Sequence, residues 1–130
     1  MKKSLFVLAL LFAGCGGNSA EKKILADAAR IHNEMMELAE QIETRIDGLQ
    51  PDSLQLPADT LANIRQSFST WESDVVEVPG NEEHHHEEGE EHHHDHKTVD
   101  VTAQQMLTIQ TELNRRLLEI QARVDRVSKQ

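Results

Sequence analysis

Apolar residues recur at steps of three and four in three separate stretches of the chain, and this spacing is the strongest constraint on its fold. Such a stripe runs along one face of an α-helix, with polar residues on the other faces. The members of the three stripes are Ile24, Ala28, Ile31, Met35, Leu38, Ile42, Ile46 and Leu49; Leu61, Ile64, Phe68, Trp71, Val75 and Val78; and Ala103, Met106, Ile109, Leu113, Leu117, Ile120, Val124 and Val127. The spacing predicts three helices, over about 20–47, 59–78 and 98–128.

Turn and capping residues separate the predicted helices. Gly48 ends the first helix, the pair Pro79 and Gly80 ends the second, and Thr98 or Thr102 can cap the third. Short connections make neighbouring helices antiparallel, so we expect an all-α fold, a three-helix bundle that runs up, down and up. The stripes also fit a long hairpin of the first and third helices with the second at its edge, or a bundle completed by a second copy of the chain. The oligomeric state stays open.

Composition narrows the classes of function. Aromatic residues make up 3% of the 130 residues, and helix-favouring side chains predominate, which disfavours an all-β fold. The balance of 13 basic and 23 acidic side chains gives a charge of −10, the wrong sign for a nucleic-acid surface. The stripes supply enough side chains for a small core but not for an internal pocket, and the serines around Trp71 have no His or Lys base within a helical turn. We therefore expect a protein that is not an enzyme.

The amino terminus has the pattern of an export signal. Lys2 and Lys3 precede an apolar run over 5–13, which is too short to span a bilayer but matches the apolar region of a signal peptide. The run leads into L-F-A-G-C at 11–15, which resembles the lipobox of bacterial lipoproteins, where small residues precede a cysteine. This cysteine is the single one in the chain, so an intramolecular disulfide and a cysteine-based zinc site are both excluded.

The resemblance to lipoproteins implies a lipid anchor. In that family the signal is cleaved before the cysteine, whose thiol receives a diacylglycerol and whose new amino group is acylated. Applied to Cys15, this gives a signal peptide over 1–14, a lipid-anchored linker over 15–19 and a helical domain over 20–130. Several acyl chains attach a protein stably, so we expect a lipoprotein of the bacterial cell envelope with the membrane as a partner. The resemblance favours the outer membrane, because Gly16 stands where inner-membrane lipoproteins often carry Asp.

A histidine-rich tract separates the second stripe from the third. Residues 80–97 include no apolar side chain, so the loop over 79–97 cannot pack against a core, and we expect it to be disordered. Within it, E-E-H-H-H occurs at 82–86 and again at 90–94, and seven of the eight histidines of the chain lie in the tract. The tract is therefore a dense array of imidazole and carboxylate groups.

This array predicts binding of transition-metal ions. Neutral imidazole is a common ligand of Zn(II), Cu(II) and Ni(II), and neighbouring carboxylates add oxygen ligands or orient the rings. The candidate ligands are His84, His85, His86, His92, His93, His94 and His96, with Glu83, Glu87, Glu91 and Asp95 as candidate carboxylate co-ligands. The tract does not have the fixed spacing of a rigid zinc site, so we expect weakly specified binding, with zinc as the first choice and nickel or copper as alternatives. Such binding suits buffering, sensing, or delivery to a metal transporter or another envelope protein.

Two other interpretations of the tract stay open. A run of charges is often a solvated linker, in which case the protein is a helical interaction or structural lipoprotein whose surface contacts another envelope protein. The tract also carries one Lys against seven acidic residues, and protonation of its histidines near a pKa of about 6.5 would change its charge from −6 to about +1. That change would make it a proton sensor.

One histidine lies outside the tract. His32 precedes Met35 and Met36 by one turn, which fits a soft copper site, although packing of the methionines beside a half-exposed histidine is the simpler interpretation. The segment I-H-N-E-M-M at 31–36 is similar to one in small helical lipoproteins without an assigned activity, and it implies no function.

The expected topology also places the tract. The first helix starts near the anchor at Cys15, and the second helix returns toward it. We therefore expect the loop after the second helix to lie at the membrane-proximal end, a turn or two short of the start of the first helix.

Overall fold

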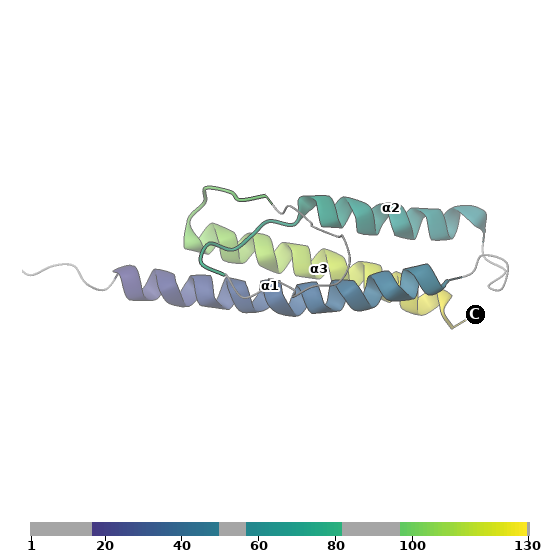
Figure 1. Cartoon of the computed structure of the whole chain (residues 1–130), viewed down its shortest axis with the longest axis horizontal. Helices are drawn as coiled ribbons and strands as arrows, with labels where there is room; N and C mark the ends of the chain where they lie inside the picture. The colour runs from purple at the N-terminus through teal and green to yellow at the C-terminus, as the bar shows by residue number, and fades with distance from the viewer. Residues whose placement is uncertain (1–16, 50–56, 82–96, 130) are drawn as a thin grey trace, which may run out of the picture.

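The computed structural model describes residues 17–49, 57–81 and 97–129, and these form three helices (Figure 1). Helix α1 spans Gly17–Gly48, α2 spans Ala58–Asp74 and α3 spans Ala103–Val127. The described residues include one isolated parallel bridge, between Val76 and Lys97, and no strand. The predicted all-α three-helix bundle is confirmed.

The helices run up, down and up, as predicted. Contacts of His32 with Gln110 and of Arg45 with Asp125 show that α1 and α3 run parallel. Helix α2 runs antiparallel to both and packs chiefly on α3 (Figure 1). The most extensive interface in the bundle is the one between α1 and α3, although these helices are far apart in the sequence.

The core between α1 and α3 follows a strict heptad pattern. Each buried residue near α1 lies 78 positions before a buried residue of α3, from positions 28 and 106 to positions 49 and 127, with steps of four and three throughout. This is the spacing of a parallel coiled-coil seam, in which residues at equivalent heights pack in layers. The buried residues of this seam are Ala28, His32, Met35, Ala39, Ile42, Ile46 and Leu49 on one side, and Met106, Gln110, Leu113, Leu117, Ile120, Val124 and Val127 on the other.

The heptad seam corrects two of the predicted stripes. His32 is buried where the sequence stripe had Ile31, and Gln110 is buried where it had Ile109. Both isoleucines are half-buried at the side of the seam. Hydropathy could not assign a His and a Gln to the core, because their burial depends on a hydrogen bond between helices that a single-helix pattern does not include.

The second helix ends earlier than predicted. It stops at Asp74, and the next residues continue in an extended conformation, with Val75 at φ −61° and ψ 135°. Val75, Val76 and Val78 are all buried. Their branched side chains favour extended backbone over helix, and the extended path buries three valines where the predicted helical stripe included two.

The third helix starts later than residue 98. Thr102 is its N-cap and forms a capping box with Gln105, in which each side chain accepts a hydrogen bond from the backbone N–H of the other residue. Of the two predicted caps, Thr102 is correct. Residues 98–102 precede the helix and are not helical, and Val99 and Val101 pack against the core.

Trp71 fixes α2 against α3. Its indole Nε1–H donates to the Leu113 carbonyl at 2.9 Å, and its ring stacks with that of Phe68 at a centroid separation of 5.7 Å. Because the indole is buried, this hydrogen bond satisfies its polar edge. None of the three described helices is both long and apolar enough to cross a membrane.

Candidate functional site

The residues predicted to carry the function lie outside the described part of the chain. These are the lipidation residue Cys15, the candidate ligands His84, His85, His86, His92, His93, His94 and His96, and the co-ligands Glu83, Glu87, Glu91 and Asp95. The structure does describe the residues on either side of the tract. We call residues 76–81 together with Lys97 the tract base.

The tract base pairs the segment before the tract with the residue after it. Val76 and Lys97 form the parallel bridge, and the Glu77 N–H donates to the Lys97 carbonyl at 3.0 Å. A turn follows in which the Asn81 N–H donates to the Val78 carbonyl at 3.1 Å. Gly80 has φ +79° in this turn, a conformation that glycine adopts without strain. The segment that precedes the tract is therefore paired with the residue that follows it.

The tract base is attached to the middle of α1. The side chains of Asn33 and Asn81 exchange two hydrogen bonds, with N···O distances of 2.7 and 3.4 Å. Asn33 lies 16 residues after Gly17, which is about 24 Å along a helix. The expectation that the loop begins a turn or two from the start of α1 was therefore wrong. The cause is the length of α2, which has 17 residues against the 32 of α1 and so ends well short of the start of α1.

A buried polar cluster contacts the tract base. His32 is 1% exposed and Gln110 is fully buried, and Oε1 of Gln110 lies 3.2 Å from Nδ1 of His32. The Gln110 amide Nε2 donates to the Val76 carbonyl at 2.9 Å. Gln110 thus joins all three elements around it: α3, which carries it, α1 through His32, and the tract base through Val76. The expectation of a half-exposed His32 was wrong.

The hydrogen bonds of this cluster fix the tautomer of His32. A carbonyl can only accept, so the Gln110 atom facing Val76 must be the amide nitrogen, and the atom facing His32 must be the amide oxygen. Nδ1 of His32 therefore carries a hydrogen and donates to it. The other ring nitrogen, Nε2, lies 3.7 Å from Oε2 of Glu77. An imidazole nitrogen of His32 thus lies near a carboxylate oxygen of Glu77, which belongs to the tract base.

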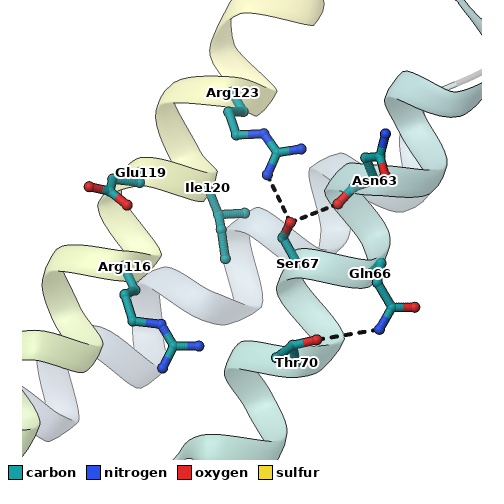
Figure 2. Close-up of a pocket in the computed structure, with 8 residues that line it drawn as sticks. All are labelled: Asn63, Gln66, Ser67, Thr70, Arg116, Glu119, Ile120 and Arg123. Atoms are coloured by element: carbon teal, nitrogen blue, oxygen red, sulfur yellow. Dashed lines mark hydrogen bonds between the residues drawn. The ribbon is translucent and has the colours of Figure 1, made fainter.

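A second feature is a polar groove between α2 and α3, with a volume of about 530 Å³ (Figure 2). Arg116 and Arg123 extend into it from α3. Arg123 donates to the Ser67 hydroxyl at 2.8 Å, Ser67 donates to the Asn63 carbonyl at 2.7 Å, and Arg116 pairs with Asp74 at 2.8 Å. Because these groups already bind one another, the groove offers polar surface but no activated nucleophile.

Comparison of the chain with models of known protein families, with curated proteins and with solved structures finds no match. The candidate site therefore rests on the sequence and on the geometry of the tract base. Across residues 17–49, 57–81 and 97–129, no three His, Cys, Asp or Glu side chains are grouped to hold a metal ion.

Sequence reasoning missed the roles of Glu77 and Gln110. No role was predicted for Glu77, which falls near the end of the predicted second helix. Gln110 carried a signal, because it stands between Met106 and Leu113 at the four-and-three spacing of the core. A polar residue at a heptad core position indicates a specific partner, and His32 at the equivalent height of α1 is that partner.

Proposed function

We propose that the protein is a lipid-anchored component of the bacterial cell envelope that binds transition-metal ions through its histidine tract. Cys15 in the lipobox-like segment supports the anchor, and the doubled E-E-H-H-H sequence supports the ligand array. Zinc is the first choice of ion, with nickel or copper as alternatives. The bound ion would be buffered, sensed, or passed to a transporter or another envelope protein.

The observation that best supports this proposal is the repeat itself. Its two histidine triplets, at 84–86 and 92–94, are separated by five residues. Two groups joined by a short linker meet at an effective concentration in the millimolar range. The two triplets are therefore available to one ion, which favours coordination by both copies of the repeat.

The proposal also explains the acidic character of the tract. Coordinating imidazole must be unprotonated, and carboxylates next to the rings hold the second ring nitrogen or add an oxygen ligand. Seven acidic residues accompany the seven histidines between Gly80 and Lys97. A solvated linker would need the acids but not the histidines.

Calorimetric titration of the full-length protein in detergent micelles with Zn(II), Ni(II) and Cu(II) tests metal binding. The test variant replaces the seven tract histidines by asparagine and keeps every acid, while a matched control replaces Glu83, Glu87, Glu91 and Asp95 by their amides and keeps every histidine. We expect the first variant to lose most of the bound zinc and the second to retain most of it. Equal zinc binding by the wild type and the histidine-free tract would refute the proposal.

A second function from a different class is supported by the groove between α2 and α3. Its arginines and hydroxyl groups give a polar surface of the kind that contacts another protein. In that case the tract is only a solvated linker. Deletion of residues 82–96 separates the two functions in cells, because a metal-binding role predicts altered growth under metal limitation or excess, whereas an interaction role predicts an unchanged phenotype.

A further inference from the structure

We propose that the groove between α2 and α3 binds an acidic helix of a partner protein, with Arg116 and Arg123 as the two residues that receive its carboxylates. The inference rests on the interaction function proposed for this groove, and it names the chemistry of the partner. It does not depend on metal binding by the tract, so the two can fail separately.

The first argument is the state of the Arg123 guanidinium. Arg123 is half-buried in the groove and donates to the neutral Ser67 hydroxyl. A guanidinium has five N–H donors, and no carboxylate pairs with Arg123 among the residues that the structure describes. Four other arginines in that part of the chain do pair with carboxylates: Arg30, Arg45, Arg115 and Arg116. In a chain with a charge of −10, Arg123 is therefore a positive group without a paired negative charge.

The second argument is the charge of the groove walls. The residues that α2 contributes are polar but uncharged: Asn63, Gln66, Ser67 and Thr70. Helix α3 contributes two arginines and one acid, Glu119, which pairs with Arg115. Figure 2 shows the Glu119 carboxylate directed away from α2. The groove therefore presents positive charge beside hydrogen-bonding side chains, and this complements an acidic surface.

The third argument is the spacing of the two arginines. Arg116 and Arg123 lie seven residues apart on α3, which is about 10.5 Å along the helix. The buried side chain of Ile120 lies between them in the groove. A helix that lies along the groove and carries acidic residues two turns apart repeats this spacing, whereas one small anion does not span it. Two antiparallel helices also form walls between which a further helix can pack.

The fourth argument is a carboxylate that already binds one of the arginines. Oδ2 of Asp74 lies 2.8 Å from a guanidinium nitrogen of Arg116. Asp74 is the last residue of α2, where a negative side chain is unfavourable because the C-terminal end of the helix dipole is itself negative. Its side chain is 48% exposed, so it has room to move aside. We therefore expect Asp74 to compete with a partner carboxylate for Arg116.

Titration with a synthetic acidic helix tests the proposal. The probe is an alanine-based peptide of about 20 residues, long enough to form a helix in water, with Glu at every seventh position. The control peptide has Gln in place of each Glu. Each peptide is added to the full-length protein in micelles while nitrogen-15 NMR follows the backbone amides. We expect the Glu peptide to shift the amides of 63–70 and 116–123, and the Gln peptide to leave them unchanged at the same concentration.

Three variants test the contribution of each charge. Arg123→Gln removes the charge without a carboxylate partner, and we expect it to weaken binding about 10-fold, as loss of one charge-assisted hydrogen bond does. Asp74→Asn frees Arg116 and should strengthen binding, a result that a variant that fails to fold cannot give. Arg65→Gln is the matched control and should leave binding unchanged, because it removes an exposed arginine of α2 that does not line the groove.

Several results would overturn the proposal. One is that the Glu peptide leaves the groove amides unchanged, or that the Gln peptide or acetate at the same carboxylate concentration shifts them equally. Another is that Arg123→Gln and Arg65→Gln have the same effect on binding. A failure of Asp74→Asn to strengthen binding would overturn the role of Arg116. None of these results decides the interaction function itself, which the deletion of residues 82–96 tests in cells.

Discussion

The hydrogen bond between His32 and Gln110 predicts strong energetic coupling between α1 and α3. Gln110→Leu leaves the His32 Nδ1–H and the Val76 carbonyl without their amide partner in the core, and each such buried group costs roughly 1–3 kcal/mol. His32→Leu leaves the Gln110 oxygen without its donor and costs a similar amount for that group. In the double variant, neither the His32 donor nor the Gln110 acceptor exists. We therefore expect the double variant to be more stable than the sum of the single changes predicts, by about 2–3 kcal/mol.

Urea unfolding followed by far-ultraviolet circular dichroism measures this coupling. The free energies of unfolding of wild type, both single variants and the double variant complete a double-mutant cycle. The control pairs His32→Leu with Leu117→Ala, seven residues and about 10 Å further along α3, where the effects should add within about 0.5 kcal/mol. If His32→Leu and Gln110→Leu were equally additive, the buried hydrogen bond would not stabilise the seam and the argument would be refuted.

Three further predictions concern capping, the second helix and a surface ion pair. Thr102→Ala should lower the free energy of unfolding by about 1 kcal/mol through loss of the capping box, and Thr102→Ser should restore most of it in the same urea assay. Trp71→Phe removes the donor to the Leu113 carbonyl and part of a buried ring, so we expect the free energy of unfolding to fall by about 2 kcal/mol. A fall of less than about 0.5 kcal/mol, roughly the effect of a surface substitution, would exclude a stabilising role for that hydrogen bond. Hydrogen bonds from Arg115 lower the pKa of Glu112 in the folded protein. Their stabilising effect is therefore fully present at pH values above the ordinary pKa of glutamate. It is lost as the pH falls through the lowered pKa that Glu112 has in the folded protein. Arg115→Gln should return the pKa of Glu112 to its usual range in a carboxyl carbon-13 NMR titration.

The number, type and order of the helices could be predicted from the sequence. Three stripes with regular spacing and turn residues between them are sufficient for this, because each stripe must face a common core. Helix ends were less predictable. The four-and-three spacing of the second stripe continues through Val75 and Val78 whether the backbone is helical or extended, so apolar spacing alone could not show that α2 ends at Asp74.

The polar layer of the seam could not be predicted by counting apolar residues. His32 and Gln110 are 78 positions apart, and each is unfavourable in the core without the other. Their pairing favours one register of α1 against α3, since a shift by one heptad would bury both groups without partners. Glu77 was equally hidden, because its position beside His32 depends on the end of α2 and on the pairing with Lys97. These contacts are all non-local, whereas the sequence patterns record only local spacing.

Because Val76 is paired with Lys97, the histidine tract between them can change in length without disturbing the packing of the helices. Residues inserted between these two positions would displace no member of the seam. For an insertion without structure of its own, each doubling of the connecting length adds only about 0.6 kcal/mol to the cost of joining its ends. Ligand groups can therefore be added or removed by duplicating a few codons while the helices stay in register. The two copies of E-E-H-H-H have the form that such a duplication would leave.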